Sequence, residues 1–362
     1  MMTSNKANIY KYPVVIRDRT IPKKINGREA IFLDTNIWID LAEAESVLAK
    51  RVKKLLIKLV DEGRVFCPLS EAVIWELYKQ EYDSMLRVAK LMEKLSLNIS
   101  FAIKEEIFAL EIESFVLTCI TEARMSVPNK TAIYVPIVSY LSSTGTLRFP
   151  NGWDEASMQK FAKLFVDGVS ALTLTKFLKM RRGTFSFIRK ERSPGYSETW
   201  RKRWQLTQGD KEKMRRYEEE TIASKIMLPT MNRFRAKLPL MQQLQFIDVL
   251  KSLPRDKYGG CLAFMLAHMP ALKNEIEILT ISGFDNNRKG TMNDFFDIEM
   301  LAVPLAYADA LVSSDKWLKH LLRIGGAKIA AKIGYKFIPG LGELEIFLMK
   351  ESSERSPTPA EN

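Results

Sequence analysis

The chain has 362 residues, of which 46% are hydrophobic and 27% charged, and it carries a formal net charge of +12. This length and composition are typical of a globular protein with one large domain or two of ordinary size. No apolar run reaches the roughly 18 residues of a membrane span, and the first residues lack the apolar stretch of a signal peptide, so we expect a cytoplasmic protein. The three cysteines lie far apart and there are only two histidines, which argues against a zinc site or a Ser-His-Asp triad.

The first part of the chain alternates between strand and helix patterns. Residues 30–34 read as a short buried strand, and a helical pattern follows as far as Gly63. Residues 64–70 form a second strand pattern, and Ser70 is a good cap for the helix after it. This alternation predicts an α/β fold in which helices flank a parallel sheet.

The middle of the chain changes character. Residues 83–283 are helical in period, so we expect a large all-helical insertion, and the α/β pattern resumes at 284–345. There a helix precedes a strand that ends at Asp315, and a last strand lies before Pro339. The α/β domain is therefore predicted to be discontinuous, from 1–82 and 284–345. The polar, proline-containing tail at 346–362 is predicted to be disordered.

Acidic residues fall at matching points of this pattern. Asp34 and Asp315 each end a strand, and functional groups of open parallel sheets gather at the carboxyl ends of the strands. Helices that enter the same edge carry further acids early in their length. The full candidate set is Asp34, Glu76, Asp297 and Asp315, with Asp294 or Asp309 as a further member.

Such a cluster needs a compensating charge, because close carboxylates repel one another and raise each other's pKa. A site built only from oxygen ligands favours Mg²⁺ or Mn²⁺. Such an ion can activate water for attack on a phosphodiester. Each acid taken alone has a simpler explanation, since acids are ordinary partners of helix N-termini, and Asp34 by itself is either a helix cap or a cation ligand.

Three segments resemble the PIN-domain family of nucleases. "FLDTNIWIDL" is similar to the family's first strand, "CPLSEAVIWELYKQ" to its second strand and glutamate-bearing helix, and "DIEMLAVPLAYADALVSSDKWL" to its third block. The resemblance covers roughly residues 30–80 and 290–340, and the long stretch between them departs from the compact family pattern. Carried over by position, it implies metal-site acids and supporting polar residues as follows: Asp34, Glu76, Asp297 and Asp315, supported by Thr35, Asn36 and Ser313.

The resemblance also implies an activity and a setting. The family's activity is metal-dependent cleavage, usually of RNA, as in bacterial toxin–antitoxin ribonucleases. We accordingly expect an endoribonuclease that serves as a toxin or phage-defence effector. An inhibitor (antitoxin) or defence-system partner, and pairing of two copies into a homodimer, are further expectations that nothing in the sequence locates.

A basic segment at residues 176–216 fits a nucleic-acid partner. It holds 14 Lys or Arg against 4 Asp or Glu and carries several aromatic residues between them. Trp200 and Trp204, four residues apart, can equally pack one helix onto its neighbour. The expected nucleic-acid-binding residues are Arg181, Arg182, Arg189, Lys190, Arg192, Arg201, Lys202, Arg203, Arg215 and Arg216.

Three other functions stay open. The first is a catalytically inactive, nucleic-acid-binding scaffold with a PIN-like fold, and the second is a nuclease that acts on DNA. The third is a phosphatase that uses Asp34 as its nucleophile, like the haloacid-dehalogenase-like enzymes. Those enzymes place a second aspartate two residues further on, where this chain has Asn36.

Overall fold

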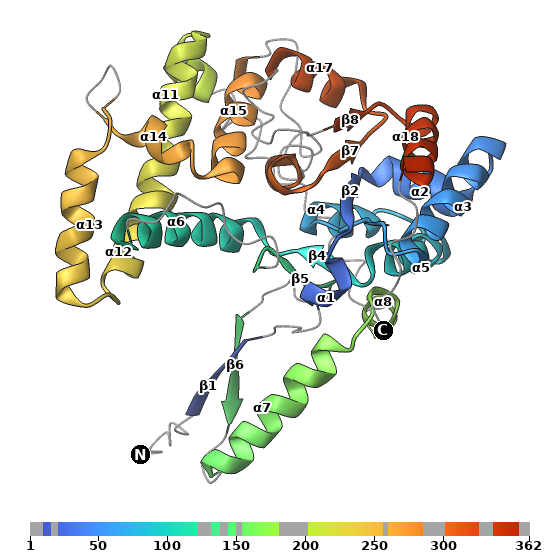
Figure 1. Ribbon diagram of the computed structural model, residues 1–362, viewed down its shortest axis with the longest axis horizontal. Helices are drawn as coiled ribbons and strands as arrows, with labels where there is room; N and C mark the ends of the chain where they lie inside the picture. The colour runs from blue at the N-terminus through green and yellow to red at the C-terminus, as the bar shows by residue number, and fades with distance from the viewer. Residues whose placement is uncertain are drawn as a thin grey trace, which may run out of the picture.

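The protein is described from a computed structural model (Figure 1). The structure describes the following residues: 10–15, 21–121, 132–137, 144–149, 154–180, 202–255, 260–284, 301–325 and 336–354. The described chain is mostly helical and contains a four-stranded parallel sheet, so the prediction of a parallel sheet flanked by helices is confirmed at this level.

The sheet has the strand order β3–β2–β7–β8, and every pair in it is parallel. Its strands are β2 (Glu29–Leu33), β3 (Val65–Phe66), β7 (Ala310–Val312) and β8 (Lys336–Ile338). Residues 30–33 of β2 are all buried, because helices cover both faces of a parallel sheet. In the pairing of β2 with β7, Ile31 lies opposite Ala310 and Leu33 opposite Val312. The two central strands therefore end at nearly the same level.

A further strand extends the sheet beyond β3. A parallel bridge joins Leu69 to Ser100 of β4 (Ile99–Phe101), and β4 also pairs antiparallel with β5 (Tyr134–Pro136). From β2 the chain thus proceeds to β3 and β4 on one side, whereas β7 and β8 lie on the other side. The direction of winding reverses between β2 and β7, and ligands of open α/β sheets bind in the crevice at such a reversal.

One group of helices packs around β2 and β3. It consists of α1 (Ile21–Ile25), α2 (Thr35–Glu43), α3 (Val47–Asp61), α4 (Glu71–Leu77), α5 (Tyr82–Ser96) and α18 (Leu341–Glu354). Within it α2 lies against α5, and α18 against α3. The apolar core of the group includes the fully buried Trp38, while Phe32 contacts Phe101 of β4 with ring centroids 6.2 Å apart.

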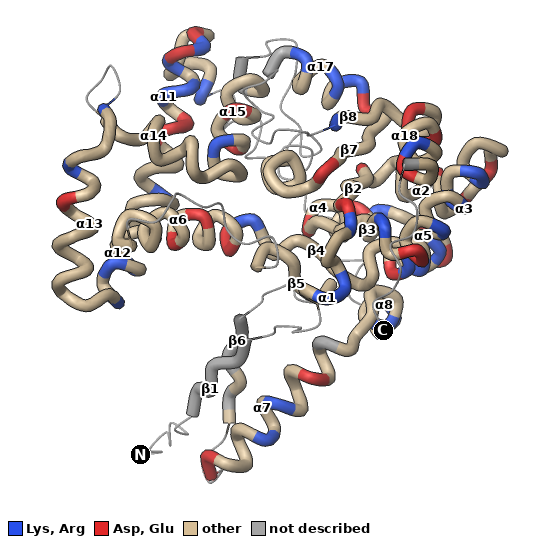
Figure 2. The backbone as a smooth tube through the Cα atoms, in the orientation of Figure 1, with Lys and Arg blue, Asp and Glu red and all other residues tan. Residues whose placement is uncertain are grey.

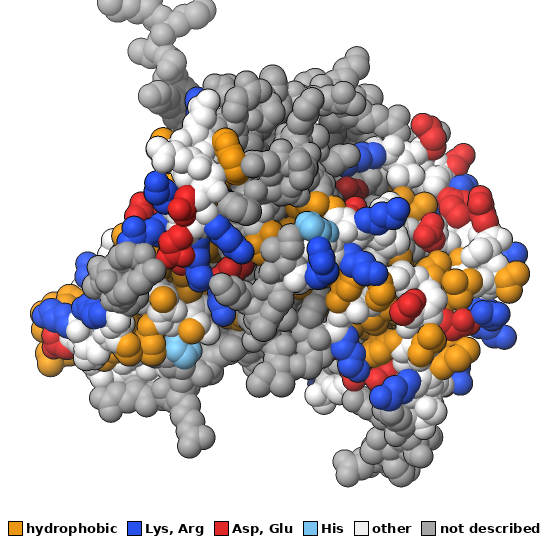
Figure 3. Space-filling view, turned by 90° about the horizontal axis from the view of Figure 1, so that it is seen from above, with side chains coloured by type: hydrophobic (Ala, Val, Ile, Leu, Met, Phe, Trp, Pro, Cys, Tyr) orange, Lys and Arg blue, Asp and Glu red, His pale blue; other side chains and the backbone are white. Residues whose placement is uncertain are grey.

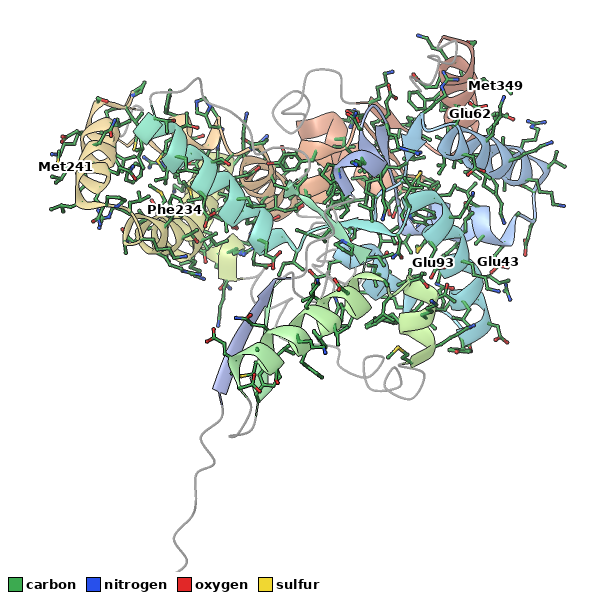
Figure 4. All side chains as sticks on the ribbon, turned by 60° about the horizontal axis from the view of Figure 1, so that its bottom comes forward. Glu43, Glu62, Glu93, Phe234, Met241 and Met349 are labelled. Carbon is green, nitrogen blue, oxygen red and sulfur yellow. The ribbon has the colours of Figure 1, made fainter. Side chains whose placement is uncertain are left out.

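A second group of helices lies on the other side of the sheet (Figure 1). Its members are α6 (Lys104–Thr121), α11 (Lys211–Ile222), α12 (Leu228–Arg235), α13 (Leu240–Ser252), α14 (Leu262–Leu266), α15 (Pro270–Phe284) and α17 (Lys316–Gly325). A π-helical turn, Ala223–Met227, joins α11 to α12. Met241 of this group and Met349 of α18 are both exposed, and they mark opposite ends of the molecule (Figure 4).

An arm extends away from both groups. It combines the antiparallel pair β1 (Tyr10–Val15) and β6 (Thr144–Phe149) with α7 (Glu155–Ser170), and α8 (Leu174–Met180) leads back to α5 (Figure 1). Phe149 of β6 packs edge-on against Phe161 of α7, which fixes the helix beside the strand pair.

A buried glutamate fastens the second group to the sheet. Glu111 of α6 accepts hydrogen bonds from Ala271 N–H (2.7 Å) and Leu272 N–H (3.0 Å) in the first turn of α15. It also accepts one from the hydroxyl of Tyr307 (2.6 Å), in the helical residues that precede β7. Burial raises the pKa of Glu111 to about 7, although these three hydrogen bonds lower it. One carboxylate therefore joins three segments that are far apart in the sequence.

Two sequence predictions are wrong. The insertion at 83–283 is not all helical, because β4, β5 and β6 lie within it, and these strands are too short or too weakly alternating to interrupt a helical pattern. The tail at 346–362 is helical as far as Glu354, since α18 packs against α3. None of the described helices combines the length and the apolar character that crossing a membrane requires.

Candidate active site

Asp34 stands where β2 ends and α2 begins. Its N–H donates to Val312 O of β7 (2.9 Å), and its Oδ1 accepts from Thr35 N–H (2.6 Å), so it caps α2. Only 5% of Asp34 is exposed. The geometry fits both a helix cap and a cation ligand. A cap uses only one carboxylate oxygen, and the second buried oxygen needs a hydrogen-bond donor or a cation as its partner.

Ser313 links Asp34 to Asp315. The Ser313 hydroxyl donates to Asp34 Oδ2 (2.6 Å) and accepts from Asp315 N–H (3.0 Å). Asp315 in turn accepts at Oδ1 from Trp317 N–H (2.6 Å) and Leu318 N–H (3.0 Å), and thereby caps α17. The two aspartates that end neighbouring strands thus belong to one hydrogen-bonded turn system.

Glu76 reaches the same place from α4. The hydroxyl of Thr35 donates to Glu76 Oε2, and Lys79 Nζ lies 3.3 Å from Glu76 Oε1. The helix is capped by Ser70, whose hydroxyl accepts from Val73 N–H (3.3 Å). Because Thr35 is the neighbour of Asp34, its contact with Glu76 places the Glu76 carboxylate near Asp34.

The charges of Glu76 and Asp315 both act on Asp34. The pKa of Asp34 is raised from its ordinary value of 3.8 to about 6, mainly because burial penalises the charged form. Repulsion from Glu76 and Asp315 raises the pKa further, while the hydrogen bonds from Ser313 and Thr35 lower it. We call Asp34 and the two acids that act on it, Glu76 and Asp315, the carboxylate cluster.

The remaining predicted site residues have different outcomes. Asn36 is exposed in the first turn of α2. Asp309 is excluded from the cluster, because it lies at the amino end of β7 and accepts a hydrogen bond from Ala30 N–H (2.9 Å). Asp294 and Asp297 lie outside the residues that the structure describes. Sequence reasoning missed Lys79, which lies in the turn after α4, three residues from Glu76.

The described residues meet the needs of a divalent ion only in part. Within the described ranges, no three His, Cys, Asp or Glu side chains are grouped closely enough to hold a metal. Both Asp34 oxygens accept hydrogen bonds from the protein, and Asp315 uses only Oδ1 in its cap. The donor set is nevertheless entirely carboxylate, as Mg²⁺ and Mn²⁺ prefer, and one aspartate predicted to complete it, Asp297, falls outside the described ranges.

The predicted basic segment is only partly described, and two of its arginines have other roles. Arg203 lies 3.4 Å from the buried Glu218, so it serves in an ion pair between helices. Arg215 pairs with Glu219 (3.0 Å) and with the buried Glu277 of α15 (2.9 Å). These ion pairs give Arg203 and Arg215 a structural role, and nucleic-acid binding by them stays a prediction.

The other predicted binding residues are not tested in this way. For Lys202 and Arg216, which are described, nucleic-acid binding stays a prediction. Arg181, Arg182, Arg189, Lys190, Arg192 and Arg201 lie outside the described residues. The ring of Trp204 packs against Gly209, where a Cβ atom would lie only 2.6 Å from the ring. Gly209 also has a φ of +69°, which favours glycine at this position. This contact favours the packing interpretation of Trp204.

A pocket of about 260 Å³ adjoins α4. Its lining includes Ser70, Glu71 and Trp75 of the α4 segment, Phe101 at the carboxyl end of β4, and Lys104. Glu71 accepts a hydrogen bond from the Trp75 indole (3.1 Å), which fixes the ring at the pocket wall. The pocket thus lies at the same edge of the sheet as the carboxylate cluster.

No protein-family model matches this chain, and comparisons with curated proteins and with solved structures found no match either. The functional interpretation therefore depends on the geometry of the site and on its sequence motifs.

Replacing Ser313 by alanine removes the hydroxyl that joins Asp34 to Asp315. We expect Ser313→Ala to lower the free energy of unfolding by about 1–2 kcal/mol, because a buried carboxylate oxygen loses its donor. The pKa of Asp34 should rise further above 6, since the Ser313 hydrogen bond lowers it. Urea unfolding at pH 7 measures the first effect, and Ser314→Ala, at an exposed neighbour, is the control. Equal stability of the two variants would contradict this role of Ser313.

Proposed function

We propose that the protein is a Mg²⁺- or Mn²⁺-dependent nuclease with a PIN-like fold that cleaves RNA internally. The observation that carries this proposal is the meeting of Asp34, Glu76 and Asp315 at the point where the winding of the sheet reverses. Glu76 and Asp315 both repel the buried Asp34 there, and a fold gains nothing from this repulsion unless a cation offsets it. The three motifs that resemble the PIN-domain family each contain one of these acids.

Each residue of the site has a role in this proposal. Asp34 and Asp315 would hold the ion together with Asp297, and Asp294 is a further candidate. A bound ion of this kind makes its water more acidic and neutralises charge that develops on a phosphodiester. Glu76 would orient the attacking water and take up its proton, Thr35 orients Glu76, and Ser313 holds the two aspartates in register.

The substrate assignment has separate support. A net charge of +12 favours a polyanion, and the resemblance favours RNA over DNA. A role as a toxin or phage-defence effector in the cytoplasm, with an inhibitor partner and pairing of two copies, belongs to the proposal only through the resemblance.

One observation favours a second candidate function. Both oxygens of Asp34 already accept hydrogen bonds, from Thr35 N–H and Ser313 Oγ. In a protein that has lost its metal, hydrogen bonds within the protein would satisfy the aspartate oxygens in this way. The alternative is therefore a nucleic-acid-binding scaffold without catalysis.

Cleavage assays separate the two functions. The wild-type protein is incubated with labelled single-stranded RNA, tRNA, single-stranded DNA and a small phosphate ester, each with Mn²⁺, with Mg²⁺ or with EDTA. We expect internal cleavage of RNA that depends on the metal and stops in EDTA. RNA binding without cleavage under every condition would instead establish the scaffold, and hydrolysis of the phosphate ester alone would indicate a phosphatase.

A further inference from the structure

The exposed face of α17 is uniformly basic. Lys316, Lys319, His320 and Arg323 recur at helical spacing and are all exposed, and no acid lies within this helix (Figure 2). The opposite face holds Leu318 and Leu321, which are 3% and 1% exposed and fix the orientation of the helix against the core. We call the three strong cations, Lys316, Lys319 and Arg323, the α17 ridge.

Within the part of the chain that the structure describes, no acidic side chain pairs with the ridge. Among the described contacts, its only side-chain interaction is that of Arg323 Nη2 with His320 Nδ1 at 3.5 Å. Arg203 and Arg215, by contrast, are engaged with buried glutamates. Figure 3 shows several basic side chains near a histidine on the face seen from above. Three cations on one face, with no acidic partner among the described residues, form a concentrated positive surface that a polyanion can neutralise.

The ridge also begins at the candidate site. Asp315 caps α17, so Lys316 directly follows a member of the carboxylate cluster. With a rise of about 1.5 Å per residue, Arg323 lies roughly 10 Å further along the helix, the length of about three stacked nucleotides. A strand that enters the site therefore passes along a row of cations.

We propose that the α17 ridge binds the phosphodiester backbone of single-stranded RNA and leads the strand to the carboxylate cluster. This inference rests on the proposed nuclease function and specifies how that site holds its substrate. Lysine and arginine contacts to phosphate do not read bases, so binding through the ridge tolerates any sequence. The chain has a second predicted basic surface at 176–216, of which residues 181–201 lie outside the described ranges, whereas the ridge is described and adjoins the cluster.

Salt-dependent binding tests the ridge. The full-length protein is titrated with fluorescent 12-nucleotide RNA or DNA single strands in EDTA, which prevents cleavage, at salt concentrations from 50 to 200 mM. The ridge variant is Lys316→Gln/Lys319→Gln/Arg323→Gln. The control variant Lys50→Gln/Lys54→Gln/Lys90→Gln loses the same charge from exposed lysines of α3 and α5. Circular dichroism and thermal melting establish that both variants fold.

We expect the ridge variant to bind RNA about 10-fold or more weakly at 50 mM salt, and its slope of log K against log salt to be smaller by about 2. The control should stay within about 2-fold of wild type, as charges far from a contact are screened. Equal affinities and slopes for the two variants, or no binding by the wild type, would overturn the inference. Stronger binding of DNA than of RNA would overturn its RNA assignment. Ridge-dependent binding without cleavage in Mn²⁺ would instead refute the nuclease function and leave the ridge in place.

Discussion

Asp34→Asn is expected to lose at least about 100-fold in metal-dependent cleavage and, at the same time, to unfold less readily than wild type at pH 7. Mutation of a residue that hydrogen-bonds to a metal ligand typically lowers metal affinity or activity 10–100-fold. Removal of a ligand itself should lower activity by at least as much. The gain in stability has a separate cause, because an uncharged amide avoids both the burial penalty and the repulsion from Glu76 and Asp315. An essential residue that weakens the fold is typical of a functional site.

The stability effect has a defined pH window. The folded pKa of Asp34 is about 6, above the ordinary 3.8, so between these values the folded state binds more protons than the unfolded state. Wild-type stability should therefore fall as pH rises from about 4 to 6 and stay low above that. Two pKa units correspond to about 3 kcal/mol at most, and we expect a gain of about 1–2 kcal/mol from Asp34→Asn at pH 7.

Urea unfolding in EDTA at pH 4, 5, 6 and 7 measures this gain. The difference between Asp34→Asn and wild type should vanish near pH 4 and reach its full size near pH 7. Asp83→Asn, at an exposed position in the first turn of α5, is the matched control and should show no such pH dependence. A variant that is less stable than wild type at pH 7 would show that Asp34 is chiefly a structural cap.

Glu111→Ala is expected to destabilise the protein by about 3–5 kcal/mol, enough to unfold many domains of ordinary stability. The substitution leaves the Ala271 and Leu272 amides and the Tyr307 hydroxyl without their acceptor and opens a cavity in the core. Because the pKa of Glu111 is raised to about 7 from 4.5, its contribution should weaken as pH rises through that interval.

Thermal melting and urea unfolding report this loss. Glu111→Gln keeps one carbonyl acceptor and should lose less, about 1–2 kcal/mol. Glu113→Ala removes a half-buried glutamate from the same helix as the control and should change stability by less than about 0.5 kcal/mol. If Glu111→Ala and Glu113→Ala were equally stable, Glu111 would not fasten α15 and the segment before β7 to α6.

The sheet and the cluster could be predicted because their signals are local. A run of apolar residues such as 30–33 can only be a buried strand or helix, and Asp34 directly after it marks the strand end. The rule that functional groups gather at the carboxyl edge then brings Asp315 to the same place. The sequence did not show at which edge of the sheet Asp309 lies. The strand is short, and a residue two or three positions from its end can lie at either edge.

The sequence does not reveal contacts between residues that are distant along the chain. The positive charge of Arg203 and Arg215 is visible in the sequence, but their partners Glu218 and Glu277 lie on other helices, and only the fold brings them together. The strand β4 has three residues and owes its conformation to Leu69 and β5, so no periodicity reveals it. The segment after residue 345 is polar overall and is helical because it packs on α3.

Calorimetric titration of Mn²⁺ into the metal-free protein at pH 6 tests the carboxylate cluster most directly. Repeated in buffers of different ionisation enthalpy, it also counts the protons released. We expect the wild type to bind the ion and release part of a proton, because about half of Asp34 is protonated at that pH and the ion displaces this proton. The Asp34→Asn and Asp315→Asn variants should bind far more weakly. Absence of binding by the wild type, or equal binding by all three proteins, would contradict a metal site built on these acids.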